Sequence, residues 1–313
     1  MSTFDVTGAT LDHDVAGDGG PLVVQLHGLT SSRDRDARIG LDVSRAIGGH
    51  RILRYDARGH GRSTGTADPD RYRWDALAED LLALLDDVAP GEQVHGVGPS
   101  MGTGTLLHAA VRDPGRFATL TLTVPPTAWT TRRVQARTYL ANADVVEREG
   151  LAHFVALARE QAGPPALADA PLTEPSVAET LLPAVLRGAA ATDLPEPELV
   201  REIGVPTLVL AWSDDPNHPL STAALLHELV DDSELVVART PYGIMAWPGL
   251  VADHVLTHPA PLAPWAPPVD PTPALRGFGA LFPWRRRGEA VSPVQGPAPA
   301  GKPIRSGAVV DEG

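Results

Sequence analysis

Residues 93–104 read Gln-Val-His-Gly-Val-Gly-Pro-Ser-Met-Gly-Thr-Gly, and this stretch decides the fold of the chain. Its apolar first half predicts a strand, and the helical run 105–111 follows directly. Between the two, residues 98–102 form a Gly-x-Ser-x-Gly pattern centred on Ser100. A serine in so sharp a strand-to-helix turn has a strained backbone that presents its hydroxyl at the edge of the sheet, and the glycines on either side avoid clashes. The stretch is therefore interpreted as a nucleophile elbow rather than an ordinary glycine-rich turn.

The segments around the elbow alternate between two kinds of pattern. Apolar runs suited to buried strands lie at 21–26, 50–55, 117–124, 206–212 and 234–239, and helical patterns lie between them. Residues 3–17 predict a hairpin, and Ser31 or Ser32 is expected to cap a helix that runs to about Ile47. This alternation predicts an α/β fold with a mostly parallel central sheet flanked by helices.

Two segments depart from the alternation. Residues 125–203 are helical in pattern and interrupted by prolines, so they predict a helical cap inserted into an α/β domain that spans residues 1–258. Twelve of the 31 prolines lie in residues 259–313. A segment of this composition buries too little apolar surface to order itself, so we expect a flexible tail.

The overall composition excludes several classes of function. The chain has 313 residues, a formal net charge of −13 and no cysteine. An acidic protein is a poor partner for nucleic acid or for an anionic membrane, and a chain without cysteine has no disulfide and no thiolate chemistry. No metal-binding constellation or phosphate-binding loop is present, so no cofactor or metal is expected. The first residues lack the features of a signal peptide, which predicts a cytoplasmic protein.

Four motifs stand in the order found in a known superfamily: His27-Gly28, residues 56–63 (Asp-Ala-Arg-Gly-His-Gly-Arg-Ser), the elbow at 98–102, and residues 215–219 (Asp-Pro-Asn-His-Pro). Over residues 15–258 the chain resembles the α/β-hydrolases. Within them it is similar to the branch of ester and lactone hydrolases that includes the 3-oxoadipate enol-lactonases. The resemblance implies the hydrolase fold and a small carboxylic ester or lactone as substrate.

The resemblance also implies roles for individual residues. Ser100 is the expected nucleophile, and the backbone N–H groups of Met101 and Leu29 are the expected oxyanion donors. Serine needs a base to remove its proton and a carboxylate to orient that base. Asp215 follows a predicted strand at the right place to be this acid, and its neighbour Asp214 is the second choice. A dehalogenase or an epoxide hydrolase of this fold would carry aspartate at the elbow, so Ser100 argues against both.

The expected base is absent from its usual place. In the family a histidine follows the last strand, but residues 238–248 contain none. His153 in the cap and His218 near Asp215 remain as possible substitutes. Because loss of the base costs triad hydrolases roughly 10⁶-fold in rate, two alternatives stay open. One is a catalytically impaired ligand-binding protein, and the other is a non-hydrolytic lyase, cyclase or isomerase that uses the oxyanion hole.

The sequence leaves the substrate open. Several apolar cap residues either line a pocket or form the cap's own core, namely Pro125, Pro126, Trp129, Tyr139, Leu140 and Phe154.

Overall fold

A single sheet runs through the computed structural model, which describes residues 2–17, 19–43, 46–160, 163–171, 173–261 and 304–306. Within these residues its strands are β1 (Ser2–Val6), β2 (Ala9–Ala16), β3 (Leu22–Gln25), β4 (Arg51–Tyr55), β5 (Val94–Pro99), β6 (Phe117–Thr123), β7 (Thr207–Trp212), β8 (Ser233–Ala238) and β9 (Ile304–Ser306). Their order in the sheet is β1-β2-β4-β3-β5-β6-β7-β8-β9. Only β1 with β2 and β2 with β4 pair antiparallel, among the described strands.

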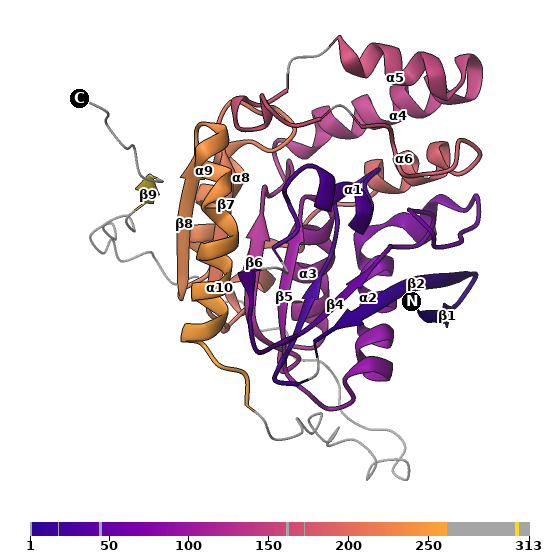
Figure 1. The fold of residues 1–313 in the computed structure, drawn as a ribbon. Coiled ribbons are helices and arrows are strands. Elements are labelled where there is room, and N and C mark those ends of the chain that lie inside the picture. The colour runs from indigo at the N-terminus through magenta and orange to yellow at the C-terminus, as the bar shows by residue number, and fades with distance from the viewer. Residues whose placement is uncertain are drawn as a thin grey trace, which may run out of the picture.

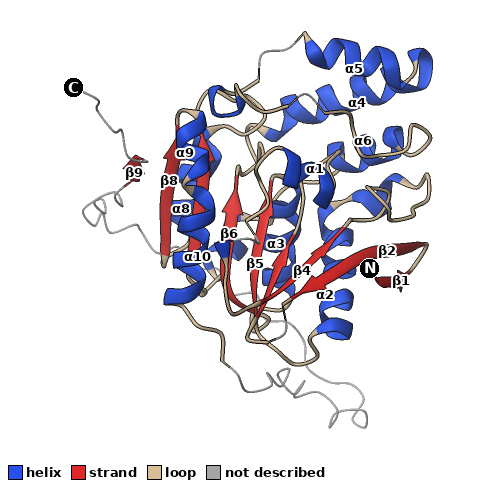
Figure 2. Cartoon of the chain, in the orientation of Figure 1, coloured by secondary structure: helices blue, strands red, loops and turns tan. Residues whose placement is uncertain are grey.

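Helices cover both faces of the sheet (Figures 1 and 2). The helices outside the cap are α1 (Arg33–Arg38), the short η2 turn (Pro69–Tyr72), α2 (Trp74–Val88), α3 (Met101–Arg112), α8 (Leu220–Leu229), α9 (Pro241–Met245) and α10 (Trp247–Thr257). Leucines of α2, α3 and α8 share one buried cluster with the sheet, and α10 packs in a second cluster with residues of β5, β7 and β8. The predicted α/β fold, with a mostly parallel sheet between helices, is confirmed.

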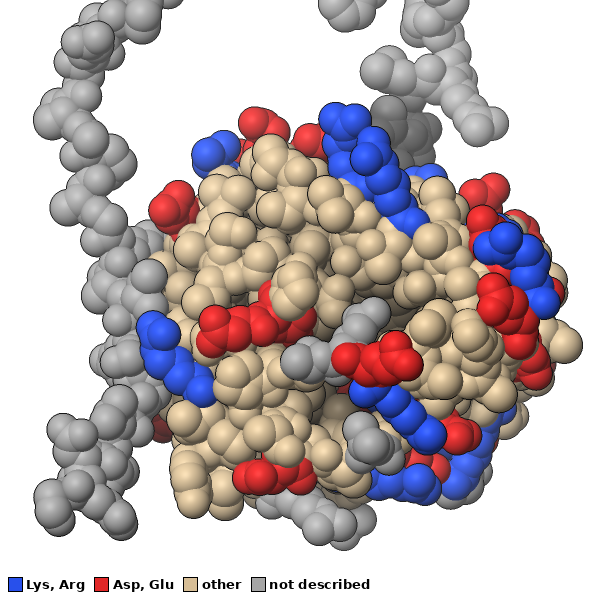
Figure 3. All heavy atoms as spheres, turned by 90° about the horizontal axis from the view of Figure 1, so that it is seen from above, with Lys and Arg blue, Asp and Glu red and all other residues tan. Residues whose placement is uncertain are grey.

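The cap lies between β6 and β7 in the chain, over the ends of the strands where the elbow is (Figure 1). It consists of α4 (Arg132–Glu149), α5 (Leu151–Arg159), the η3 turn (Pro165–Leu167), α6 (Leu182–Ala190) and α7 (Pro197–Arg201). Apolar residues of α4 and α6 form a separate buried cluster. The backbone ties the cap to the sheet, because Ser176 N–H donates to the Thr30 carbonyl (2.8 Å) and Gly61 N–H donates to the Ser176 carbonyl (2.7 Å). In the view onto this end, uncharged residues cover much of the face, with small groups of acidic and basic side chains among them (Figure 3).

Three elements differ from the sequence predictions. Helix α1 ends at Arg38 instead of Ile47, and Gly40, with φ of +80°, turns the chain away. The unexpected helix α9 follows β8, and the unexpected strand β9 pairs parallel with β8 in the segment predicted as a flexible tail. Hydrogen bonds to an otherwise unpaired edge favour such a strand. The rest of that tail, from 262 to 303 and from 307 to 313, lies outside the described residues. None of the described helices is both long and apolar enough to cross a membrane.

Candidate active site

Ser100 lies in the turn between β5 and α3, in a strained conformation. Its φ is +51°, a region that costs a non-glycine residue roughly 1–3 kcal/mol. Its N–H donates to the carbonyl of Thr123 on the neighbouring strand (3.0 Å), which holds the turn in place. The turn also requires glycine: a Cβ added to Gly98 would lie 2.8 Å from the carbonyl carbon of Gly102. The sequence therefore folds here into the predicted elbow.

The loop after β3 passes directly over Ser100. A Cβ added to Gly28 would lie 3.8 Å from the Ser100 Cβ, which is ordinary van der Waals contact. Leu29 follows in this loop, and Met101 is the first residue of α3. Neither the Leu29 nor the Met101 N–H donates a hydrogen bond to any described residue. Two backbone N–H groups left free in these segments are compatible with the predicted role of oxyanion donors.

His27 holds this loop rather than taking part in proton transfer. Its Nε2 accepts from the Ala57 N–H (2.9 Å), so its Nδ1 carries the proton and donates to the Gly28 carbonyl (2.8 Å). Burial lowers the pKa of His27 to about 4, against a smaller opposing effect of the Gly28 carbonyl. The ring is therefore neutral at pH 7 and serves as a fixed support for the Gly28 carbonyl.

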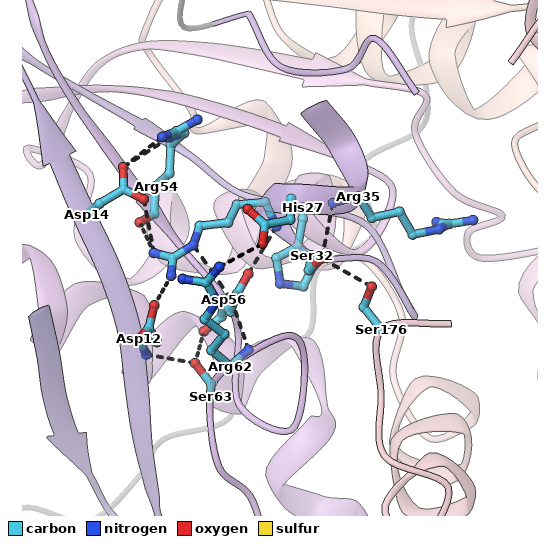
Figure 4. A network of polar contacts seen from close by, with 12 residues as sticks. Asp12, Asp14, His27, Ser32, Arg35, Arg54, Asp56, Arg62, Ser63 and Ser176 are labelled. Carbon is cyan, nitrogen blue, oxygen red and sulfur yellow. Dashed lines mark hydrogen bonds and ion pairs between the residues drawn. The ribbon is translucent and has the colours of Figure 1, made fainter. Parts of the chain in front are cut away.

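A buried ionic network supports the next turn of the same loop (Figure 4). Arg33, at the start of α1, pairs through its side chain with Asp12, Asp14 (3.2 Å) and Asp56 (3.7 Å). Its backbone N–H donates to Asp56 Oδ1 (3.0 Å). Ser32 caps the helix, since its Oγ accepts from the backbone N–H three residues on (3.2 Å). These contacts join the start of α1 to β2 and to the end of β4. They therefore hold the preceding loop, which carries the candidate oxyanion donor Leu29, in a fixed position relative to the sheet.

The loop between β7 and α8 brings two predicted candidates to Ser100. His218 Nε2 lies 2.9 Å from Ser100 Oγ, and His218 Nδ1 lies 2.7 Å from Asp215 Oδ2. A carboxylate only accepts, so Nδ1 carries the proton and Nε2 is left to accept from the serine hydroxyl. The three side chains form one continuous chain of hydrogen bonds. Asp215 and His218 are only three residues apart, so one loop supplies both.

Several donors surround the Asp215 carboxylate, whose side chain is 6% exposed. Oδ1 accepts from the Asn217 N–H (2.8 Å), and Oδ2 accepts from the indole Nε1–H of Trp212 (2.8 Å) as well as from His218. Burial by itself raises the pKa of Asp215, but the hydrogen bonds and the charge of His218, with the donors of Asn217 and Trp212, outweigh it. The net pKa lies below its ordinary value, so the carboxylate is ionised at neutral pH.

The shape of the loop explains how His218 reaches the serine. Asp214 has φ of +60°, and its carboxylate accepts from the Ser213 hydroxyl (2.7 Å), away from the hydrogen-bond chain. The Asn217 carbonyl accepts from the Thr127 N–H (3.0 Å), which ties the loop to the chain just after β6. A left-handed residue and a contact between distant segments leave no periodic signal in the sequence. The Asp-Pro-Asn-His-Pro motif was the available signal, and it identified both residues without indicating the contact with Ser100.

The second substitute considered for the base lies elsewhere. His153 is on α5, about half exposed, and its Nε2 is 2.9 Å from Oε2 of Glu149, the last residue of α4. The segment after β8, where the family histidine was expected, forms α9 with Tyr242 81% exposed. Of the two substitute histidines, the structure brings only His218 to Ser100.

Comparison with known proteins identifies the family to which this fold belongs. The model of the alpha/beta hydrolase fold family matches residues 21–241, more than half of the chain. The protein belongs to the α/β-hydrolase fold family, as the four sequence motifs predicted.

Individual relatives are hydrolases by name. The chain is 29% identical to 3-oxoadipate enol-lactonase 2 of Acinetobacter baylyi over 202 residues, covering 61% of this chain and 71% of that protein. Among solved structures, a hydrolase from Pseudomonas aeruginosa has a TM-score of 0.67 at 24% identity, with coverage of 82% of this chain and 97% of the other. The enol-lactonase from Burkholderia xenovorans has a TM-score of 0.58 at 22% identity, with coverage of 82% and 100%. Because these solved structures are less than 25% identical to the chain, they support the fold alone. The resemblance to enol-lactonases rests on the sequence match.

Proposed function

We propose that the protein is a serine hydrolase that cleaves a small carboxylic ester or lactone through an acyl-enzyme at Ser100. His218 is the proposed base and Asp215 the acid that orients it. The backbone N–H groups of Leu29 and Met101 are the proposed oxyanion donors. The observation that carries this proposal is the chain of hydrogen bonds from Ser100 Oγ to His218 Nε2 (2.9 Å) and from His218 Nδ1 to Asp215 Oδ2 (2.7 Å).

The reaction follows from this geometry. His218 accepts the Ser100 proton as Oγ attacks the carbonyl carbon, and Asp215 stabilises the imidazolium that forms. The two backbone N–H groups then bind the negatively charged oxygen of the tetrahedral intermediate. Collapse of the intermediate breaks the bond to the alcohol oxygen, which receives the proton from His218. A water molecule, deprotonated by the same histidine, then releases the acid and restores Ser100.

The geometry around Ser100 favours a hydrolase over the two alternatives that the sequence left open. Both a ligand-binding protein and a non-hydrolytic enzyme were suggested by the lack of a histidine after the last strand. A base on the β7–α8 loop supplies the same function from another element. The proposal also includes a small-molecule substrate and a cytoplasmic location. It includes no stable contact with membrane or nucleic acid, because the net charge of −13 disfavours both.

The first test is covalent labelling with a fluorophosphonate, read by intact mass and peptide mapping. We expect modification of Ser100 in the wild-type protein and none in Ser100→Ala. His218→Ala is expected to label far more slowly, and its kcat on a short-chain 4-nitrophenyl ester should fall by about 10⁴- to 10⁶-fold, because no group remains to accept the serine proton.

Matched variants test whether the rate depends on the proposed acid and base or on nearby residues of the same type. Asp215→Asn should lower kcat by about 10⁴-fold, whereas Asp214→Asn, one residue away and outside the hydrogen-bond chain, should keep the wild-type rate. His153→Ala should also keep it. A protein that neither labels at Ser100 nor hydrolyses short esters or lactones would contradict the proposal and favour the ligand-binding alternative.

A further inference from the structure

The turn that carries the candidate oxyanion donor Leu29 is strained. Residues 28–31 form a four-residue turn that is closed by a hydrogen bond from the Ser31 N–H to the Gly28 carbonyl (3.1 Å). Its third residue, Thr30, has φ of +59°. Turns with positive φ at this position favour glycine or asparagine there, and such a conformation is a genuine outlier for a β-branched residue. Strain of this kind persists only where the surrounding structure holds it, so neighbouring groups must hold this turn in its shape.

One of these groups is the acid Asp36 of α1. The Ser31 hydroxyl donates to Asp36 Oδ1, and both residues are buried, at 2% exposure. The backbone N–H of Asp36 donates to the Ser32 carbonyl (2.9 Å), which fixes the acid within the helix. The pair of Ser31 and Asp36 therefore anchors the last residue of the turn to α1.

The cap holds the same turn from another side. The Ser176 N–H donates to the Thr30 carbonyl (2.8 Å), and the Ser32 hydroxyl donates to the Ser176 hydroxyl (3.1 Å) (Figure 4). Ser176 is itself held, because its carbonyl accepts from the Gly61 N–H (2.7 Å). The strained residue is therefore tied to the cap through its own carbonyl and to α1 through the residue that follows it.

Leu29 lies inside this anchored turn. Its N–H makes no hydrogen bond with a described residue, and its side chain packs against both the main buried cluster and the cap cluster. The preceding Gly28 adjoins the nucleophile, since a Cβ added there would lie 3.8 Å from the Ser100 Cβ. Relaxation of Thr30 would turn the neighbouring peptide groups, and a displacement of about 1 Å near the reacting atoms can cost roughly 10²-fold in rate. The shape of the turn therefore determines how well the donor is placed.

We infer that Asp36 and Ser176 are positioning residues for the proposed oxyanion donor. They hold Thr30 in its left-handed conformation, and this conformation directs the Leu29 N–H at the reacting oxygen. The inference rests on the proposed function and deepens it, because the donor is in place only while the cap segment 173–177 contacts the turn. Neither Asp36 nor Ser176 touches the substrate or takes part in proton transfer.

The first test is Ser31→Ala, which removes the hydroxyl that joins the turn to Asp36. We expect kcat on a short-chain 4-nitrophenyl ester to fall by about 10- to 100-fold with little change in KM, because the oxyanion forms only after the substrate has bound. Asp36→Ala should give a similar loss, whereas Asp36→Asn keeps an oxygen that accepts from Ser31 and should recover most of the rate. Asp34→Ala changes an exposed carboxylate of the same helix and should keep the wild-type kcat.

Glycine at position 30 separates positioning from general packing. Glycine adopts positive φ without steric cost, so Thr30→Gly allows the turn to keep its shape without the anchors. In this background Ser31→Ala should lower kcat by less than about 3-fold, and a double-mutant cycle measures this coupling. An equal loss in both backgrounds would overturn the inference, because Ser31 would then act by some route other than holding Thr30.

The contact with the cap is tested in the same way. Ser176→Pro removes the N–H that donates to the Thr30 carbonyl, so kcat should fall by about 10-fold or more, and Thr30→Gly should again reduce the loss. Glu174→Pro removes an N–H of the same segment that donates to no carbonyl of the described backbone, and it should keep the wild-type kcat. Equal losses in the two proline variants would contradict the role of the cap.

Amide hydrogen exchange distinguishes failure of this inference from failure of the proposed function, since it requires neither turnover nor a folded proline variant. The Ser176 N–H should exchange about 10-fold faster or more in Ser31→Ala than in the wild type, and should return toward the wild-type rate in Thr30→Gly/Ser31→Ala. This result would support the anchored turn even if Ser100 proved unreactive. Labelling of Ser100 and hydrolysis of esters without such a change in exchange would leave the hydrolase proposal intact and contradict the anchors.

Discussion

The residue that sets this site apart is Trp212, the last residue of β7. Its indole N–H donates to the Asp215 oxygen that also accepts from His218, and its ring meets the His218 ring edge-on at 5.8 Å. It is buried, at 4% exposure, and stacks on Trp247 at 5.9 Å. Trp212 therefore fixes the side chains of Asp215 and His218 together, and we regard it as a positioning residue.

Replacing Trp212 with phenylalanine tests this role. The aromatic packing is largely kept, but the carboxylate loses a donor, which raises the pKa of Asp215 and loosens its orientation. We expect kcat to fall by about 10- to 100-fold with little change in KM for a short neutral ester, and the acid limb of the rate–pH profile to move to higher pH.

Trp247→Phe is the matched control for this variant. It also removes a buried indole N–H, but that N–H has no hydrogen-bond partner among the described residues. Its kcat and its rate–pH profile should stay at the wild-type values. If both variants lose activity equally, general packing rather than the hydrogen bond to Asp215 is responsible.

At the scale of elements, the close crossing of β5 and α3 determines where Ser100 lies. Gly98→Ala would place a Cβ 2.8 Å from the backbone of Gly102, which cannot move without shifting α3. We expect a loss of about 1–3 kcal/mol in the free energy of unfolding from this overpacking. A shift of the elbow should also lower kcat by up to about 10²-fold.

Urea unfolding and ester hydrolysis measure the two effects separately. Gly249→Ala on α10 provides the control, because a Cβ there would meet no atom within 4 Å. Alanine in an exposed helical position stabilises rather than destabilises. Unchanged stability and rate in Gly98→Ala would show that the turn tolerates a side chain.

The elements differ in how well the sequence predicts them, for a physical reason. Helix α2 buries one face and carries a clear periodicity, and β5 is a fully buried apolar run; both were predicted close to their observed bounds. Helix α9 and strand β9 are too short for such a pattern, and β9 depends on pairing with β8. The early end of α1 depends on Gly40, whose positive φ the sequence permits but does not require.

At the scale of the whole molecule, the candidate site combines loops that are far apart in the chain. The motifs predicted Ser100, Leu29, Met101 and Asp215 from their place after strands, and the structure brings Gly28 and Asp215 to the same end of the sheet as Ser100. The proximity of His218 to Ser100 could not be predicted, because it depends on a loop conformation and on a separation of 118 residues. Such a contact exists only once the sheet has formed.

A buried acid on α1 affects the stability of the whole fold. Asp36 is 2% exposed, its Oδ1 accepts from the Ser31 hydroxyl, and its Oδ2 has no hydrogen-bond partner among the described residues. Burial raises its pKa to about 7, although the hydrogen bond from Ser31 acts in the opposite direction. The folded state therefore binds this proton more tightly than the unfolded state does, whose pKa is about 3.9. Its contribution favours folding below about pH 4 and is lost progressively as the pH rises to about 7.

Asp36→Asn, which has no charge to bury, should remove this pH dependence. We expect its midpoint of thermal unfolding to exceed that of the wild type by several degrees at pH 8, and the difference to shrink toward pH 4. Asp34→Asn, which changes an exposed carboxylate on the same helix, should give no such pH-dependent difference. A constant difference between Asp36→Asn and wild type across this pH range would exclude the titration of Asp36 as its cause.

The short spacing of Asp215 and His218 has a consequence for protein engineering. In a triad whose acid and base come from separate loops, grafting the pair onto another scaffold requires two transplanted segments that must be aligned. Here one segment, from Trp212 to Pro219, carries the proposed acid, the proposed base and the indole that bonds to the acid. The pair could therefore be transplanted as one segment, and a recipient α/β-hydrolase would need a matching strand end opposite its own serine together with partners for the Asn217 carbonyl and the Trp212 ring.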